Sequence, residues 1–316
     1  MGGLCSKETQ STTSTTTSTA IETEREVNLI KYTSTADKTY ELQEGKYNFF
    51  RKINYADYLY SLVHFSTDNA TLEDNYQGIS VNYSMNDPFF TESFSNDIFQ
   101  SFLENKILKH KAVYDEASNN ESMTSIFKEC FLSANTGLGL KLAQDAQAKG
   151  DSSADKNNIV KKCDCIGYGL LYCSGPNYIK IKSLYNMFQE NGALKASDKF
   201  SGFLLSLFLL ASYGMVNARN KLNKFEEMGT VSKEQLKELI DTSELKDSQN
   251  LVQVTNKLIF GEDTSQSLNY QQFKDKFAID NKETSLAFLL SASGVRHMLT
   301  VHNVQKNKKV NKCYMI

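Results

Sequence analysis

The chain has 316 residues, of which 40% are hydrophobic, so it can bury the core of one large domain or of two ordinary ones. Its formal net charge of −2 argues against general nucleic-acid binding, which depends on a clustered excess of lysine and arginine. No apolar stretch reaches the roughly 20 residues that a membrane-spanning helix needs, and the chain does not begin like a secretory signal. We therefore expect a cytosolic globular protein with reduced cysteines.

The first residues, Met1-Gly2-Gly3-Leu4-Cys5-Ser6, fit the signal for N-terminal myristoylation, which asks for glycine after methionine and serine four residues later. One myristoyl chain binds a membrane only reversibly, so stable attachment needs a second signal. Palmitate on Cys5 would supply that signal. The sequence thus predicts a peripheral protein, held by Gly2 and Cys5 at the cytoplasmic face of a membrane; the alternative is a chance match.

The segment after this signal is almost entirely polar and cannot bury enough apolar surface to fold by itself. A second polar stretch, with Gly150 among serines and aspartates, reads as a linker between two lobes. The predicted divisions are a flexible tether over 1–26, an N-terminal helical lobe over 27–143, a linker over 144–160, a C-terminal lobe over 161–303 and a basic tail over 304–316.

Apolar residues recur at helical spacing along both lobes, which predicts an all-α fold. In the first lobe the pattern runs from Ile98 to Leu108, with Ser95 as an expected N-cap. In the second lobe the predicted helices are Ile179–Phe188, Phe200–Tyr213, Lys233–Ile240, Leu251–Phe260, Gln271–Phe277 and Leu286–His302.

Several of these helices follow a short segment in which an aliphatic residue precedes a polar residue by four positions. Ile53 precedes Asp57 in this way, and Leu268 precedes Gln272. Looser copies place Val231 before Gln235 and Leu194 before Asp198. The aliphatic residues at 194, 231 and 268 are evenly spaced, which is typical of a repeated supersecondary unit.

This pattern resembles the second half of an EF-hand, in which the aliphatic residue at loop position eight forms a short β-bridge and position twelve supplies the last calcium ligand. The stretch from Gly169 to Gly175, followed by Lys180, Tyr185 and Phe188, is similar to a helix of the calcineurin B and neuronal calcium sensor group, many of whose members are N-myristoylated. The resemblance covers 169–302 and one fragment near 46–64. It implies helix–loop–helix units and a protein partner that offers an amphipathic helix.

The loops depart from the family at their ligand positions, because a calcium loop needs oxygen ligands at positions 1, 3, 5, 7, 9 and 12 and glycine at position 6. The Leu268 loop keeps a single carboxylate, and the other loops place lysine or methionine at position 1. We therefore expect no bound calcium and no cofactor. The remaining loop positions that match are Gly192, Gly229 and Asp263. The alternative is that these segments are ordinary helix starts, with Ser232 and Asn269 in capping boxes.

Other motifs are weaker. Cys313-Tyr314-Met315-Ile316 has the outline of a prenylation signal at Cys313, with lysines before it. The pair Cys163 and Cys165 lacks the spacing of a zinc site. The histidines lie on separate segments with no nucleophile motif beside them, so the sequence does not indicate an enzyme.

The sequence thus predicts a non-catalytic adaptor, lipid-anchored at the cytoplasmic face of a membrane, whose EF-hand-like body does not bind calcium. A functional calcium sensor and a structural subunit of a membrane-associated or cytoskeletal assembly are the alternatives. The apolar run from Phe203 to Ala211 is a candidate wall of a groove for a partner helix. Plain core packing is the competing interpretation of that run.

Overall fold

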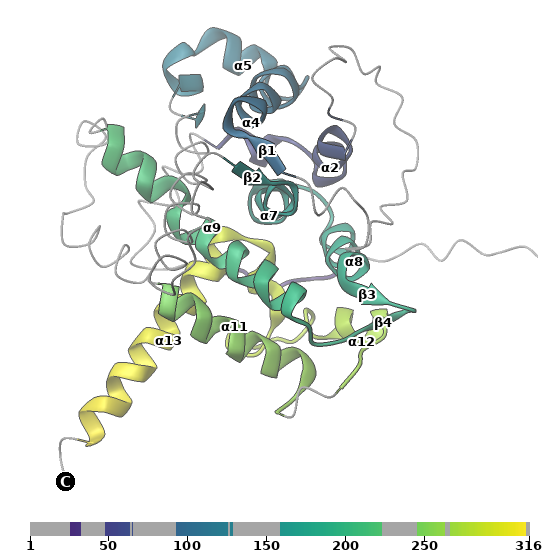
Figure 1. Cartoon of the computed structure of the whole chain (residues 1–316), viewed down its shortest axis with the longest axis vertical. Coiled ribbons are helices and arrows are strands. Elements are labelled where there is room, and N and C mark those ends of the chain that lie inside the picture. The colour runs from purple at the N-terminus through teal and green to yellow at the C-terminus, as the bar shows by residue number, and fades with distance from the viewer. Residues whose placement is uncertain are drawn as a thin grey trace, which may run out of the picture.

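The computed structural model describes residues 26–32, 48–63, 65, 93–125, 127–128, 159–222, 245–262 and 266–313 (Figure 1). For residues 93–96, 159, 212–222, 245–247 and 303–313 the backbone alone is described. Helices make up most of the described chain, which confirms the prediction that α-structure dominates.

The elements of the first half are the 3₁₀-helix η1 (Phe49–Lys52), α2 (Tyr55–Val63), β1 (Ser93–Ser95), α4 (Asn96–Phe102), the π-helix η2 (Leu103–Ile107) and α5 (Tyr114–Asn119). The elements of the second half are β2 (Ile159–Lys161), α7 (Lys162–Tyr172), α8 (Asn177–Phe188), β3 (Gln189–Glu190), β4 (Ala193–Leu194), α9 (Asp198–Leu222), α11 (Leu245–Phe260), α12 (Tyr270–Asp275), the 3₁₀-helix η4 (Leu286–Leu290) and α13 (Ala292–Cys313).

Two short antiparallel pairs interrupt the helices. Strand β1 pairs with β2, with Phe94 opposite Val160, and β3 pairs with β4 in a hairpin. Ser95, which the sequence indicates as an N-cap, is the last residue of β1 and directly precedes α4. The end of the predicted linker, Ile159 and Val160, belongs to β2, whereas residues 144–158 lie outside the described part of the chain.

Helix α7 lies at the centre of the described residues, between α2 and α9 (Figure 1). Its residues from Asp164 to Tyr172 are all buried, so the helix has no solvated face. Glycines allow this close packing: a Cβ on Gly169 would lie 2.6 Å from Cδ1 of Tyr58. The Tyr58 hydroxyl in turn donates a hydrogen bond to the Cys165 carbonyl at 2.6 Å.

One hydrophobic core joins residues from both predicted lobes. It includes Phe50 and Phe102 from the first predicted lobe and Phe208 and Phe288 from the second. The apolar run from Phe203 to Ala211 in α9 contributes to this core, where α9 packs against α7, α11 and α13. Core packing, rather than an open groove wall, therefore accounts for that run.

The predicted helix over Leu286–His302 is divided in two. Ser291 has extended backbone angles, with φ −152 and ψ 145, and separates η4 from α13. Gly294 allows the break, because a Cβ there would lie 2.7 Å from the Phe288 backbone. Helix α13 then continues to Cys313, so it includes most of the segment predicted as a basic tail over 304–316. The helix predicted over Lys233–Ile240 lies outside the described residues.

A buried lysine ties three elements together. Lys180 of α8 is 5% exposed, and its ammonium donates to the carbonyls of Leu170 at 2.8 Å and Cys173 at 2.7 Å. It also approaches the Leu290 carbonyl in η4 at 3.5 Å. Burial lowers the pKa of Lys180 to about 8. The lysine thus satisfies carbonyls at the C-terminal end of α7 that the helix itself leaves without donors.

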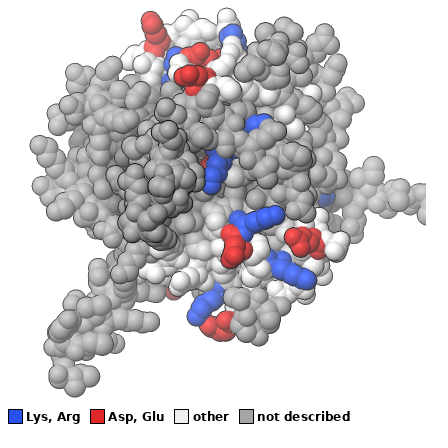
Figure 2. Space-filling model, viewed as in Figure 1, with Lys and Arg blue, Asp and Glu red and all other residues white. Residues whose placement is uncertain are grey.

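Charged side chains of both signs are interspersed on the described part of the face in Figure 2. The described residues form ion pairs such as that of Lys257 with Glu262, at 2.8 Å. No field of one sign dominates the described part of this face, in keeping with the balanced composition. Within the described residues, no helix is both long and apolar enough to cross a bilayer.

Candidate functional site: two paired helix–loop–helix units

The first unit consists of α8, a short β-hairpin and α9. Helix α8 ends at Phe188, and Asn191 and Gly192 form the turn between β3 and β4 with φ of 52 and 76. Asn-Gly is the residue pair that a two-residue hairpin turn with positive φ at both positions favours. Helix α9 then begins at Asp198, and the Phe200 N–H donates to Ser197 Oγ at 3.2 Å, which caps the helix.

The second unit consists of α11, a loop and α12. Helix α11 ends at Phe260, and Gly261 follows it with a positive φ of 87, which is typical of a glycine after a helix C-terminus. Asn269 and Gln272 form a reciprocal capping box: each side-chain oxygen accepts the other residue's backbone N–H at 2.9 Å. The capping role considered from the sequence is therefore correct at Asn269.

A reciprocal backbone bridge joins the two loops. The Leu194 N–H donates to the Leu268 carbonyl at 2.8 Å, and the Leu268 N–H donates to the Leu194 carbonyl at 2.9 Å. Both leucine side chains are buried. The Tyr185 hydroxyl reinforces the bridge, because it donates to the Gly192 carbonyl at 2.6 Å and lies 3.4 Å from the Leu268 carbonyl. The loops of two units that are far apart in sequence are thus fixed side by side.

Two of the polar side chains in these loops bond to the backbone of the protein itself. Gln189 Oε1 accepts the Gly192 N–H at 2.7 Å, and the Gln272 side chain is used in its capping box. Position 1 of the Leu194 loop is Met187, which is buried inside α8. Asp198 at position 12 is exposed at the first turn of α9. Neither a thioether nor a neutral amide supplies the anionic oxygens that calcium requires.

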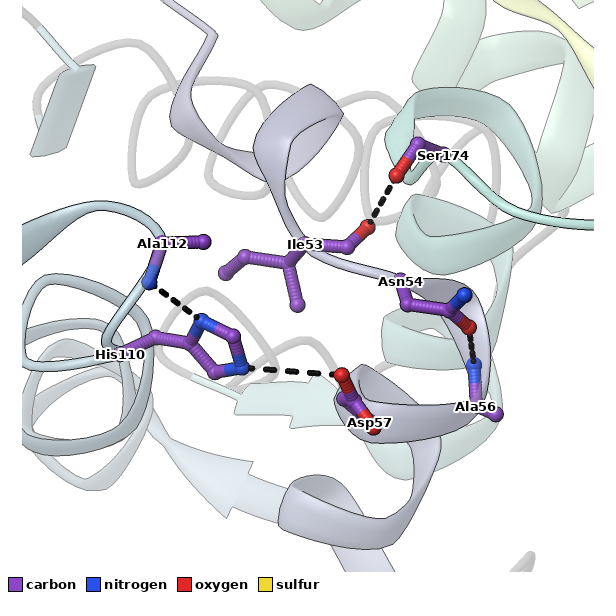
Figure 3. Close-up of polar contacts among 7 residues, drawn as sticks. All are labelled: Ile53, Asn54, Ala56, Asp57, His110, Ala112 and Ser174. Carbon is purple, nitrogen blue, oxygen red and sulfur yellow. Dashed lines mark hydrogen bonds and ion pairs between the residues drawn. The ribbon is translucent and has the colours of Figure 1, made fainter.

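The Ile53 segment makes a different contact (Figure 3). The Ile53 carbonyl accepts bonds from the Ser174 N–H and hydroxyl, both at 3.0 Å, and the Tyr55 N–H donates to the Ser174 carbonyl at 2.8 Å. This parallel bridge joins the start of α2 to the connection between α7 and α8. The bridge pairs Asn54 with Ser174, so within the described residues the Ile53 segment joins Ser174 and not the Leu194 or Leu268 loop.

Asp57 faces a histidine in the same region (Figure 3). Asp57 Oδ2 lies 3.9 Å from His110 Nε2, and His110 Nδ1 accepts the Ala112 N–H at 3.2 Å. Asn54 caps α2 by accepting the Ala56 N–H at 2.9 Å. The contacts position α2 against the turn that follows the π-helix η2, so Asp57 acts as a bridging group in the described structure.

Cys165 in the first turn of α7 and Cys173 directly after the helix are buried thiols, and Cys163 is partly buried. Burial raises the pKa of Cys163 to about 12, with the nearby Asp164 carboxylate adding to the effect. Burial also raises the pKa of Cys165 and of Cys173. Metal binding needs thiolates, and no group of three histidine, cysteine or acidic side chains comes together within the described residues.

Several predicted site residues lie outside the described residues, namely Gly2, Cys5, Gly229, Val231, Gln235 and Asp263. Cys313 is the last residue of α13, and its backbone alone is described. The sequence reading also missed the hairpin at Asn191 and Gly192, although that dipeptide is the strongest short-range signal for a tight hairpin. The buried Lys180 carries no comparable signal, because a lysine in a helix is usually solvated.

No protein-family model, no curated protein and no solved structure matches this chain significantly. The assignment of a function therefore depends on the chain's own residues and contacts.

Proposed function

We propose that the α8–α9 and α11–α12 units are a divergent EF-hand pair, and that the protein is a non-catalytic adaptor. The observation that supports this proposal is the reciprocal bridge between Leu194 and Leu268, at 2.8 and 2.9 Å. Both leucines were assigned to loop position eight from the sequence alone, and that is the position at which paired EF-hand loops meet. A positive φ at Gly192, the loop's position six, is a further point of agreement.

The adaptor works without calcium. Affinity in such loops depends on the number of charged ligands and on the rigidity of the site. The Leu194 hairpin and the Gln272 capping box use their side-chain oxygens to hold the backbone, and Met187 occupies the first ligand position. Calcium binding would have to break these bonds in exchange for a single carboxylate at the ligand positions of each loop, Asp198 in one and Asp263 in the other.

The adaptor is anchored to the cytoplasmic face of a membrane through acyl chains on Gly2 and Cys5. The support for this part is the sequence of the first six residues. The tether keeps the helical body near partners on that membrane, where it binds a protein segment. Prenylation of Cys313 would add a second point of membrane attachment, at the C-terminal end of α13.

Isothermal titration of the full chain with calcium tests the calcium-independent body. We expect no binding heat at calcium concentrations up to the millimolar range, and micromolar binding would instead support the calcium-sensor alternative. Gly2→Ala tests the anchor: the variant should move from the membrane fraction to the soluble fraction, while Gly3→Ala serves as a matched control. Stoichiometric co-purification with a large complex would favour the structural-subunit alternative.

A further inference from the structure

The segment Glu26–Tyr32 is an extended piece of chain bound to elements far away in sequence. It has no regular secondary structure, and it lies beside α8 as the purple trace in Figure 1. Its hydrogen-bond partners are 150 or more residues distant. Among the described residues, no backbone–backbone hydrogen bond involves this segment, and the hydrogen bonds that hold it all use a side chain.

The first end of the segment caps a helix. Helix α8 begins after Pro176, which provides no side-chain cap. The Glu26 carboxylate takes that role, since its Oε1 accepts the Asn177 N–H at 2.7 Å. The Asn177 side chain returns a bond to the Val27 carbonyl at 3.1 Å. A carboxylate at this position also meets the positive end of the helix dipole.

The second end of the segment is anchored by an aromatic ring. Tyr32 is 6% exposed, and its hydroxyl donates to the carbonyls of Lys282 at 3.1 Å or Ser285 at 3.4 Å. The ring lies 5.5 Å from the ring of His297 in α13. Because the hydroxyl has a partly buried acceptor in Lys282 and a buried one in Ser285, this position favours tyrosine over phenylalanine.

The residues between the two ends follow the pattern of a docked peptide. Val27 is buried, Leu29 and Ile30 pack partly against the core, and Asn28 and Lys31 are exposed. A short extended segment held by a few side-chain anchors is a common mode of peptide recognition. The segment lies against α8, the turn at 282–285 and α13, and buried residues of both helices belong to the common core. We call this binding surface the groove.

We propose that this groove is the partner-docking site of the adaptor, and that Glu26–Tyr32 occupies it as a detachable intramolecular ligand. The partner is an extended peptide segment that carries an acidic residue, an aliphatic residue directly after it, and a tyrosine six positions after the acidic residue. The partner and the chain's own segment compete for the groove. This docking role rests on the proposed adaptor function, for which it defines the class of partner.

The chain has room for such an exchange. Residues 33–47 connect Tyr32 to Asn48, and a connection of this length has a maximum reach of roughly 3.3 Å per residue, which exceeds the length of Glu26–Tyr32 itself. A connection of this kind holds the segment at an effective concentration in about the millimolar range. A partner peptide in solution must therefore overcome this local competition.

The test measures binding of a fluorescent peptide of residues 25–33 to the full-length chain by anisotropy. In the Tyr32→Ala chain the groove should be open, and we expect it to bind the peptide at least about tenfold more tightly than the wild type does. Glu26→Ala, which leaves the apolar anchors in place, should give an intermediate affinity. Tyr114→Ala changes a tyrosine that is 53% exposed on α5 and should behave like the wild type.

A peptide in which alanine replaces its tyrosine should bind the Tyr32→Ala chain at least about tenfold more weakly than the original peptide. Equal peptide affinity of the wild-type, Tyr114→Ala and Tyr32→Ala chains would overturn the proposal. Loss of the cooperative thermal transition in Tyr32→Ala would also overturn it, because a detachable segment cannot be required for folding. The peptide-binding experiment involves neither calcium nor lipid. A negative result would therefore count against the docking site alone, and not against the calcium-independent, membrane-anchored adaptor.

Discussion

Replacing Lys180 with methionine tests how the body is held together at its centre. The methionine keeps most of the apolar stem but leaves the Leu170 and Cys173 carbonyls without their donor. Each buried carbonyl left unsatisfied costs about 1–3 kcal/mol. Near neutral pH we therefore expect Lys180→Met to lower the free energy of unfolding by about 2–4 kcal/mol.

The stability difference between the wild type and Lys180→Met should also change with pH. Burial lowers the pKa of Lys180 from 10.5 to about 8 in the folded chain. Between these two values the unfolded chain still binds the proton that the folded chain has released, so the contribution of Lys180 to stability rises with pH. From pH 7 to pH 9.5 the gap between wild type and Lys180→Met should widen by about 2 kcal/mol.

Urea denaturation followed by circular dichroism at several pH values measures this gap. Buried tyrosines such as Tyr58, whose pKa is raised by burial, act in the opposite direction: their contribution is present at neutral pH and is lost in strongly basic solution. They are common to both chains and cancel in the difference. A constant gap between the two chains across this pH range would refute a buried lysine with a lowered pKa.

Three further predictions concern backbone and packing, each checked by urea denaturation. Gly192→Ala should lower the free energy of unfolding by about 1 kcal/mol, because φ is +76 there; a Cβ meets nothing within 4 Å, so no steric clash adds to this loss. Its control, Gly202→Ala in the exposed interior of α9, should raise the free energy of unfolding by up to about 1 kcal/mol. Equal effects of the two substitutions would contradict a left-handed Gly192. Gly169→Ala should cost about 1–3 kcal/mol because its Cβ would meet Tyr58, and a neutral result would contradict that close approach. Asn269→Ala should cost about 1 kcal/mol by removing the cap of α12, and no loss would argue against the capping box.

Local patterns of the sequence predict the helices well. The apolar spacing within Leu251–Phe260 lies inside α11, and the aliphatic residues at 194 and 268 identify two segments that meet in the fold. These predictions succeed because helical periodicity and the spacing between an aliphatic residue and the following helix are both local properties. The capping box at Asn269 and Gln272 is equally local.

Contacts between distant segments could not be predicted in this way. Strands β1 and β2 are three residues each, too short for an alternating pattern, and Phe94 meets Val160 across a long stretch of sequence. The docking of Glu26 at the start of α8 has the same character, since nothing in the sequence near 177 indicates which residue caps that helix. The π-helix at Leu103–Ile107 keeps the apolar spacing of an ordinary helix, so periodicity alone does not distinguish it.

The central claim is that a calcium-independent helical body is held on a membrane by N-terminal acyl chains. The most direct measurement is the membrane-bound fraction of the native full-length chain in calcium buffer and in excess chelator, with the intact mass of the bound protein. The account predicts the same large membrane-bound fraction in both buffers and a mass that carries the acyl groups on Gly2 and Cys5. Release from the membrane in chelator, or a bound protein with a bare N-terminus, would contradict it.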